Sequence, residues 1–384
     1  MTRVGVVGAG PAGLMLANVL AAHGIDCVVF ERASRAHIER RARAGLIEHR
    51  AIRALDEYGL AGRLLRTGVR HGACEFRLAG RRHTARYSEL TGGRAHYVYP
   101  QQELVKDLVA AFLGHGGEIR FDTPVTGIRD LDAAPRIEWA GGGMSFDVVA
   151  GCDGAHGAAV RSVPAGALTV HEYRHGHGWL AVLAAAPPST RDIIYALHPT
   201  GFAGHMLRSA EVSRYYLQCP AGDDVAHWPD ARIWAELRRR LATDDGWCLR
   251  EGPIIEKAVL DMRSRVCEPM RFGNLFLVGD AAHIVTPAGA KGMNLALGDA
   301  HELALGLVDR YAHGDDRRLN AYSATRLDVV WRAQEFTTSF LDLLHNAIGT
   351  GRSDTYSDRV RSAIVNQITG TGPRAQDFAE SYVG

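Results

Sequence analysis

The sequence predicts a mixed α/β fold with a parallel sheet, a separate antiparallel sheet and C-terminal helices. Short apolar runs at residues 4–7, 27–30 and 275–278 are typical of strands buried in a parallel sheet. Residues 73–89 and 179–220 contain alternating, strand-like runs. Residues 299–312 and 323–345 have the periodicity of helices. No internal repeat or low-complexity linker separates these segments, so we expect interleaved units.

A glycine motif follows the first predicted strand. Gly8, Gly10 and Gly13 form GxGxxG and lead into an apolar helical run. Gly8 permits a tight turn, Gly10 lets the backbone approach a pyrophosphate, and Gly13 lets the helix pack closely on the strand. Glu31 follows the second strand, where an acidic residue binds a ribose hydroxyl. The spacing therefore predicts a Rossmann-like domain that binds a dinucleotide.

A second glycine-rich segment lies far downstream. The strand at residues 275–278 runs into Gly279 and Asp280, and residues 289–294 open a further helix. A ligand contacted by two segments so distant in sequence must span the domain. This favours FAD over NAD.

Composition excludes several classes of protein. The 384 residues are 46% hydrophobic and 23% charged, which is ordinary for a globular chain and unlike a disordered or polytopic membrane protein. The formal net charge of +1 gives no overall field for nucleic acid or an anionic membrane. The six cysteines have no CxxC or zinc-ribbon spacing, so we expect no metal and a reducing, cytoplasmic location. Residues 4–22 resemble a signal peptide, but their glycine spacing is better explained by the nucleotide-binding motif.

Several motifs, in order along the whole chain, carry a family resemblance. They are GAGPAG at residues 8–13, RARAG at 41–45, GCDG at 151–154, GWL at 178–180, IYALHP at 194–199, SRYYLQ at 213–218, GDAAHIVTPAGAKGMN at 279–294 and YVG at 382–384. Together they resemble the single-component FAD aromatic hydroxylases, and within them the 4-hydroxybenzoate 3-monooxygenase family.

The resemblance implies a three-part architecture. We expect a discontinuous FAD domain at residues 1–72, 98–178 and 264–345, and an antiparallel substrate sheet at 73–97 and 179–263. Residues 346–384 are expected to form a C-terminal helical region that helps build a homodimer.

The resemblance also implies a reaction. An NAD(P)H co-substrate reduces FAD, the reduced flavin takes up O2 as a C4a-hydroperoxide, and 4-hydroxybenzoate is hydroxylated at C3 to 3,4-dihydroxybenzoate. Direct insertion of oxygen into a ring is beyond side-chain chemistry, so a cofactor must supply the oxidant. The protein must deprotonate the phenol, hold the ring and exclude water.

Two groups of residues match the family's substrate site. Tyr195, Tyr382 and His71 are expected to relay the phenol proton to solvent, with the histidine titrating near neutrality. The Arg208 guanidinium is expected to bind the substrate carboxylate, and the Tyr216 hydroxyl is expected to add a hydrogen bond. The Pro287 carbonyl is expected to contact the phenol hydroxyl of the substrate.

The sequence departs from the family at Met206, where the hydroxybenzoate enzymes have a serine. A thioether cannot donate a hydrogen bond to a carboxylate. Gly204 and Ala288 are also smaller than is common in the family, so we expect a reshaped pocket. The substrate therefore stays open between 4-hydroxybenzoate and a substituted relative, such as 3,4-dihydroxybenzoate going to the trihydroxy acid (protocatechuate to gallate) or an amino-substituted benzoate.

Cofactor residues follow from the same matches. The expected FAD-binding residues are Gly8, Gly10, Ala12, Gly13, Glu31, Arg41, Arg43, Gln101, Asp280, Lys291, Met293 and Asn294. Arg214 matches an arginine that influences motion of the flavin ring. Arg32, His37, Arg43, His156 and Arg263 are candidates for binding the nicotinamide nucleotide, and NADPH is favoured over NADH.

Lys291 is singled out by composition as well. Of 44 lysine and arginine residues only Lys106, Lys257 and Lys291 are lysine. Lys291 alone lies in the glycine-rich segment at residues 279–294, which we call the flavin loop. It is therefore a candidate for a position where a guanidinium does not fit.

Two rival functions use the same fold. A flavin oxidoreductase would turn over without inserting oxygen, and a noncatalytic binding protein would purify colourless. Neither explains the relay residues or Arg208.

Overall fold

The computed structural model describes residues 3–41, 45–345 and 355–384. They fall into two compact units. The first unit comprises Met1–Gly68, Tyr99–Tyr173 and Ser264–Glu335, and the second comprises Val69–Val98, Arg174–Arg263 and Phe336–Gly384. The mixed α/β class expected from the sequence is confirmed.

The boundaries of the two units differ from the expected ones at several points, most clearly at the C-terminal end and around His71. Residues from Phe336 to the C-terminus cluster with the second unit, whereas a separate region at 346–384 was expected. His71, expected in the FAD domain, belongs to the second unit together with Tyr195 and Tyr382.

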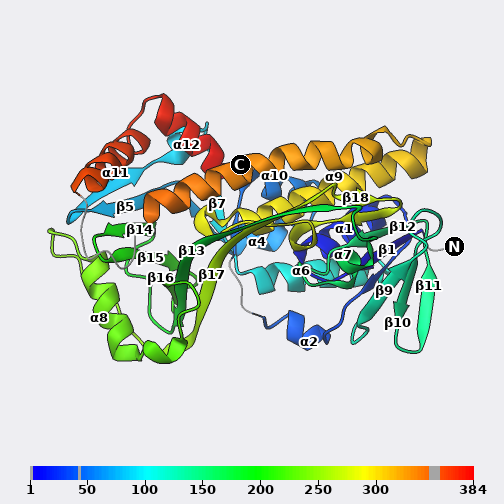
Figure 1. The fold of residues 1–384 in the computed structure, drawn as a ribbon, viewed down its shortest axis with the longest axis horizontal. Coiled ribbons are helices and arrows are strands. Elements are labelled where there is room, and N and C mark those ends of the chain that lie inside the picture. The colour runs from blue at the N-terminus through cyan, green and yellow to red at the C-terminus, as the bar shows by residue number, and fades with distance from the viewer. Residues whose placement is uncertain (1–2, 42–44, 346–354) are drawn as a thin grey trace. The chain divides into compact units, whose positions relative to one another are not determined.

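A six-stranded sheet organises the first unit (Figure 1). Its strand order is β18 (Arg271–Phe272), β19 (Leu275–Leu277), β12 (Val148–Gly151), β1 (Val4–Val7), β2 (Cys27–Phe30) and β8 (Glu118–Arg120). All neighbours pair in parallel except β18 with β19. Every residue of β1, β2 and β12 is buried, which explains why these strands are continuous apolar runs.

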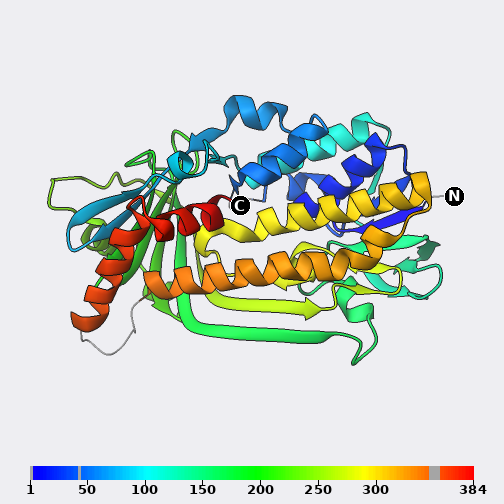
Figure 2. The same cartoon turned by 90° about the horizontal axis from the view of Figure 1, so that it is seen from above.

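Helices cover this sheet. Helix α1 (Pro11–Ala22) packs against α6 (Gln101–Gly114) and α9 (Lys291–His313). Figure 2 shows α9 running beside α10 (Arg317–Leu344), in agreement with the helical periods predicted there. A small antiparallel sheet of β9 (Val125–Arg129), β10 (Arg136–Trp139) and β11 (Gly142–Ser145) also belongs to this unit.

A larger sheet organises the second unit. Its consecutive strands are β13 (Thr169–Ala184), β16 (Ser213–Pro220), β15 (Gly201–Leu207), β14 (Ile193–His198), β5 (Cys74–Leu78) and β6 (Arg81–Ala85). The β14–β5 pair is parallel and the other pairs are antiparallel. The sheet continues beyond β13 with β17 (Ile254–Glu268) and β20 (His283–Ile284).

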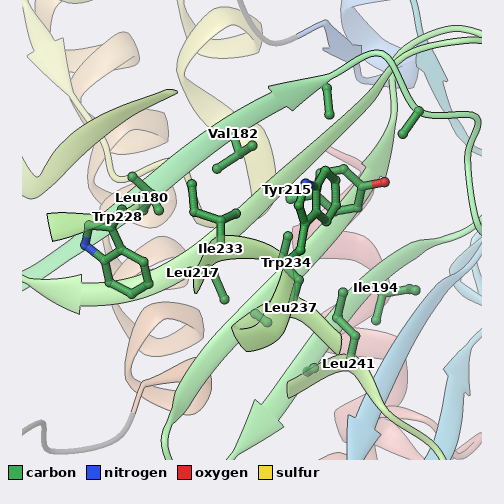
Figure 3. Packing of buried hydrophobic residues seen from close by; sticks show 14 of the residues in the cluster. Leu180, Val182, Ile194, Tyr215, Leu217, Trp228, Ile233, Trp234, Leu237 and Leu241 are labelled. Carbon is green, nitrogen blue, oxygen red and sulfur yellow. The ribbon is translucent and has the colours of Figure 1, made fainter. Parts of the chain in front are cut away.

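One face of this sheet is closed by helix α8 (Asp230–Leu241). Ile233, Trp234 and Leu237 of the helix pack on alternate residues of the strands, including Leu180 and Leu217 (Figure 3). Because side chains alternate along a strand, the residues between them point to the other face. That other face is therefore available for a different role.

C-terminal helices and an antiparallel strand pair from a three-stranded sheet, here called the ribbon, complete the second unit. The helices are α11 (Thr355–Ile368) and α12 (Pro373–Val383), and α12 packs on α5 (Tyr87–Leu90). The ribbon pairs β4 (Val69–His71) with β7 (His96–Val98). The remaining short elements are α2 (Arg35–Ile38), β3 (Leu46–Ile47), α3 (His49–Glu57), α4 (Gly62–Thr67), α7 (Ala158–Ser162), η1 (Val225–His227), η2 (Gly279–Ala281) and η3 (Ala288–Ala290). Among the described helices, none has the length and apolarity to cross a membrane.

Candidate active site

The turn between β1 and α1 has the geometry of a phosphate-binding loop. Gly8 has φ of +107°, and a Cβ there would lie 2.5 Å from the Cys152 carbonyl oxygen. A Cβ on Gly13 would lie 2.0 Å from the Gly8 oxygen, whereas one on Gly10 would meet nothing within 4 Å. Gly10 therefore faces open space, at a helix N-terminus that has no side-chain cap. The unpaired first-turn amides and the helix dipole suit an anionic group.

Glu31 stands beside this turn at the end of β2. One carboxylate oxygen accepts from the Ala9 amide and the other from the Ala33 amide, both at 2.9 Å. These bonds fix the carboxylate while leaving lone pairs for further donors. Such a held acceptor fits the hydroxyls of a ribose, so the donor set of the loop fits a dinucleotide.

The downstream segment reaches the same unit. Asp280 is exposed in η2, and α9 begins after a left-handed turn in which Gly289 has φ of 75° and Ala290 has φ of 55°. The N-terminus of α9 also has no side-chain cap. Both segments that the sequence indicated thus lead into a helix of the first unit whose start has no side-chain cap.

A buried polar cluster lies just inside the start of α9. Lys291 Nζ donates to Glu48 Oε1 at 2.6 Å. The Glu48 amide donates to Asn294 Oδ1 at 2.9 Å, and Asn294 Nδ2 donates to the Leu46 oxygen at 3.1 Å. Lys291 and Asn294, both predicted as cofactor residues, therefore tie the flavin loop to β3.

The face of the second sheet opposite α8 gathers the predicted substrate residues. Tyr195 is directly opposite Gly204, which is directly opposite Tyr216. Met206 is in turn opposite Arg214. Arg208 continues the same alternation and is buried, with 7% of its surface exposed. The strand register thus brings these residues together on one face.

Burial disfavours the charged form of Arg208, although the guanidinium stays charged near pH 7. It lowers the pKa of the guanidinium to about 10, while the Tyr216 hydroxyl acts in the opposite direction and the Arg214 charge in the same one. A carboxylate bound here would stabilise the charged form of Arg208. The site therefore favours an anionic ligand.

Gly204 does not open a void. A Cβ at this position would lie 2.9 Å from Cζ of Phe202, so the phenyl ring already lies against the glycine. The same ring packs on Trp179 at a centroid distance of 4.7 Å and on Tyr195 at 6.3 Å. The space beside residue 204 is thus filled by the Phe202 ring.

The predicted relay is partly assembled. The hydroxyl oxygens of Tyr195 and Tyr382 lie 2.8 Å apart, and both residues are buried. Burial raises the pKa of each well above its usual range, so both remain protonated and can only pass a proton on.

His71 belongs to the same unit without a direct bond to either tyrosine among the described residues. Neither of its ring nitrogens has a hydrogen-bond partner there, although the ring is buried. Burial lowers the pKa of His71 to about 4, and the charge of Arg191 acts in the same direction. His71 is therefore neutral near pH 7, and the expectation that it titrates near neutrality was wrong, because burial without a hydrogen-bond partner in the described part of the chain disfavours the charged ring.

Comparison with known proteins decides the family. The FAD binding domain family model matches residues 1–337. The p-hydroxybenzoate hydroxylase of Acinetobacter baylyi (strain ATCC 33305 / BD413 / ADP1) is 37% identical over 390 residues, covering 100% of this chain and 95% of its own.

The chain belongs to the single-component FAD aromatic hydroxylases. It is an FAD-dependent monooxygenase that hydroxylates aromatic compounds. A further relative of this hydroxylase is the 3-amino-4-hydroxybenzoate 2-monooxygenase of Streptomyces cremeus, 28% identical, with 88% of this chain and 87% of its own covered. The solved p-nitrophenol 4-monooxygenase of Pseudomonas putida DLL-E4 has a TM-score of 0.82 at 21% identity, covers 100% of this chain and 98% of its own, and shows the same fold.

The remaining predicted cofactor residues of the hydroxylase lie in the first unit, apart from Arg263. Ala12 is buried in the first turn of α1, Gln101 is the first residue of α6, and Met293 is half-buried in α9. Pro287, between η2 and η3, is exposed and Ala288 is buried. The nicotinamide candidates Arg32, His37, His156 and Arg263 are exposed, as is Arg41, whereas Arg43 lies outside the described residues. Arg263 belongs to the second unit.

Sequence reasoning missed the buried partners that hold these residues. Asp299 of the hydroxylase is fully buried and accepts from the Gly279 amide at 3.0 Å, from His283 at 2.6 Å and from Arg326 at 2.7 Å. Glu48 was missed in the same way. Each pairing joins distant segments, so the only available signal was an acidic residue inside an otherwise apolar stretch. Among the described residues, no cluster of histidine, cysteine and carboxylate side chains could hold a metal ion.

Proposed function

We propose that the enzyme converts 4-hydroxybenzoate to 3,4-dihydroxybenzoate by hydroxylation at C3. One oxygen atom of O2 enters the ring and the other leaves as water, while NAD(P)H and a proton supply the two electrons and the balancing hydrogens. The observation that carries the proposal is the sheet face with Arg208 and Tyr195, where the Tyr195 hydroxyl contacts the hydroxyl of Tyr382 from α12. The name of the 37% identical relative supports it.

FAD, once reduced, would supply the activated oxygen. The residues that fit it are the turn at Gly8, Gly10 and Gly13, the held carboxylate of Glu31, and the N-terminus of α9. Asp280, Asn294 and the backbone of Met293 are proposed to complete the binding set, with Ala12, Arg41, Gln101 and Lys291 as further contacts or supports. Arg43 is retained from the sequence alone.

The protein's own residues would prepare the aromatic ring. Arg208 would bind the carboxylate and Tyr216 would add a hydrogen bond, which fixes the ring orientation. Tyr195 would accept the phenol proton as its own proton passes to Tyr382, since their hydroxyls are in direct contact. The resulting phenolate is the stronger carbon nucleophile at the neighbouring ring position.

His71 would complete the relay. Because its pKa is lowered to about 4, the imidazole is neutral near pH 7 and holds an added proton only briefly, so it would pass the proton on to solvent rather than keep it. A direct bond to Tyr382 is not needed, since one or two waters can connect polar groups beyond hydrogen-bond distance. Pro287 remains a proposed acceptor for the substrate hydroxyl.

The reducing co-substrate is proposed to be NADPH, with NADH as the alternative. Arg32, His37, His156 and Arg263 are exposed, which suits a nucleotide that binds and leaves in each cycle. Arginine also suits a 2′-phosphate. Arg214 would influence the flavin motion that admits the nicotinamide. A homodimer in the cytoplasm is proposed on the family resemblance, and the free state of all six cysteines supports a reducing compartment.

Met206 favours a second candidate substrate. It is buried on the ligand face, where a serine would donate to the carboxylate, and a thioether packs instead against apolar or polarisable groups. The loss of that donor weakens the case for 4-hydroxybenzoate itself, and a 4-hydroxybenzoate with a 3-hydroxyl or 3-amino group is the alternative. The relative named 3-amino-4-hydroxybenzoate 2-monooxygenase supports this choice.

A substrate panel tests both candidates. We expect the purified, yellow enzyme to oxidise NADPH at least about tenfold faster with the true substrate, because ligand binding admits the nicotinamide. Product mass should rise by one oxygen atom. If neither stimulation nor hydroxylated product is found with any 4-hydroxybenzoate, the proposal is wrong. Oxidation of NADPH without oxygen insertion would indicate a flavin oxidoreductase.

A further inference from the structure

A second histidine stands beside the relay. Strands β4 and β7 pair antiparallel, and their register places His71 directly opposite His96. Directly opposite residues in such a pair project to the same face, with Cβ atoms about 5 Å apart. Both imidazoles are buried, with 3% of His71 and 0% of His96 exposed. The proposed end of the relay is therefore flanked by another titratable ring.

Tyr87 connects the two histidines. Its hydroxyl donates to the His71 carbonyl oxygen at 2.8 Å, and its oxygen lies 3.2 Å from His96 Nδ1. A hydroxyl carries one proton, and the carbonyl can only accept. The His96 Nδ1–H must therefore donate to the Tyr87 oxygen. The order of donation runs from His96 through Tyr87 to the backbone of His71.

The same two rings contact Tyr382. The His96 ring centroid lies 5.0 Å from that of Tyr382 in an edge arrangement, and the Tyr87 centroid lies 5.1 Å away. Helix α5, which carries Tyr87, packs on α12, which carries Tyr382. The hydrogen-bonded pair of Tyr87 and His96 thus contacts both the backbone of His71 and the ring of Tyr382.

We propose that Tyr87 and His96 are positioning residues of the proton relay, which keep His71 and Tyr382 aligned for proton transfer. The proposal rests on the proposed function, because it assumes that the relay removes a phenol proton. Neither residue need touch the substrate. Each acts through a relay member.

Titratable and charged groups from several elements face this cluster. The Tyr87 hydroxyl is faced by Cys74 of β5, Tyr195 of β14, Asp192 before β14 and Arg70 of β4, and Arg191 faces His71. Burial raises the pKa of Tyr87 and of Cys74, so both stay protonated. A change in the pH profile after substitution of Tyr87 or His96 would therefore report on the relay.

Three variants of the holoenzyme test the proposal. Tyr87→Phe removes the hydroxyl and keeps the ring. His96→Leu removes the donor, whereas His96→Asn keeps an amide N–H near the position of Nδ1 and should restore much of the function. Tyr215→Phe is the matched control, because it removes a buried hydroxyl that donates to the Arg250 carbonyl oxygen at 3.0 Å from the opposite face of the sheet.

The measurement is ionisation of bound 4-hydroxybenzoate. Mixing oxidised enzyme with the ligand, at values from about pH 6 to 9, follows phenolate formation by absorbance across the range of histidine and phenol pKa values. We expect Tyr87→Phe and His96→Leu to slow ionisation about tenfold and to shift its pH profile, since one bond of the support is lost. FAD content, ligand affinity and thermal unfolding should stay near wild type for His96→Asn.

Two failures can be told apart. If wild-type enzyme binds the ligand but never ionises it, the proposed relay function is wrong, and this proposal with it. If wild type ionises the ligand and Tyr87→Phe does so at the same rate and with the same profile, only the positioning proposal is overturned. An equal effect from Tyr215→Phe would also overturn it, since the loss would then be general.

Discussion

Lys291 Nζ lies 2.6 Å from Glu48 Oε1 in the interior of the first unit, with side-chain exposures of 6% and 10%. The two residues are 243 positions apart in sequence. A buried ion pair contributes little net stability when intact, but removal of one partner leaves an uncompensated charge. Replacement of Lys291 alone is therefore expected to destabilise the fold, because Glu48 would be left buried and charged.

Replacement of Lys291 by methionine should reduce the free energy of unfolding by about 3 to 5 kcal/mol, because Glu48 is left buried and charged. The double variant Lys291→Met, Glu48→Gln should recover much of this loss. Lys106→Met is the control, since Lys106 pairs with Glu103 at a more exposed site, and it should cost less than about 1 kcal/mol. Denaturant unfolding measures all three, and equal losses at the two lysines would contradict the prediction.

Substitutions at two glycines of the phosphate loop should separate folding from cofactor binding. Gly10→Ala should change stability by less than about 1 kcal/mol, because its Cβ would meet nothing within 4 Å. It should nevertheless weaken FAD binding about tenfold or more, since the new methyl group stands where the pyrophosphate approaches.

Gly13→Ala should behave in the opposite way. Its Cβ would lie 2.0 Å from the Gly8 oxygen, so the protein without FAD should lose about 1 to 3 kcal/mol. Thermal unfolding and FAD fluorescence titration, carried out on both variants, measure the two effects. A stable Gly13→Ala protein would show that the loop relaxes.

Met206→Ser should tighten binding of 4-hydroxybenzoate about tenfold, because a hydroxyl donor is added beside Arg208 for the carboxylate. Equilibrium titration of the flavin absorbance measures the dissociation constant. Weaker binding of 4-hydroxybenzoate after this change would instead indicate that the thioether packs against the ligand. In that event the 3-substituted acids should lose affinity more strongly than the parent acid does.

Acid should destabilise the protein partly through His205. Burial, and to a smaller extent the charge of Arg77, lowers its pKa to about 3, from an unfolded value of about 6.5. Between about pH 6.5 and 3, His205 therefore binds a proton in the unfolded chain but not in the folded chain. The resulting stability is complete above about pH 6.5 and is lost as the pH falls toward about 3.

His205→Gln should make this loss smaller. Its Oε1 can replace His205 Nε2 as the acceptor of the Ser189 amide, at 3.3 Å in the structure. Between about pH 7 and 5 the variant should lose about 2 kcal/mol less stability than wild type. Unfolding curves at several pH values measure the slope, and the region above about pH 7 is the internal control because the imidazole is neutral in both states.

The individual strands and helices and the first cofactor motif could be predicted from the sequence, because each depends on residues that are neighbours in the chain. The run Val4–Val7 and the glycines after it specify a strand, a turn and a helix within one short segment. The Tyr195–Tyr382 pair was also anticipated, but only through the family resemblance. Its hydroxyl contact joins residues 187 positions apart, which no periodicity encodes.

Three contacts depend on tertiary packing and could not be predicted from the sequence. The ring of Phe202 lies against Gly204, so the way in which this glycine reshapes the pocket depends on a neighbouring ring. Glu48 pairs with Lys291, and Tyr87 bridges His71 and His96, only because strand register and helix packing bring them together. Periodicity tells which face a residue occupies, but it does not tell which distant residue will be opposite.

The alternation along β15 and β16 has a consequence for how such enzymes diverge. Ala203, Tyr215 and Leu217 pack under α8, while their strand neighbours Gly204 and Tyr216 face the opposite side, which we propose binds the ligand. Selection for a folded scaffold and selection for a new aromatic compound therefore act on alternate positions of the same strands. A lineage can change its substrate one strand position at a time, without first acquiring a more stable core.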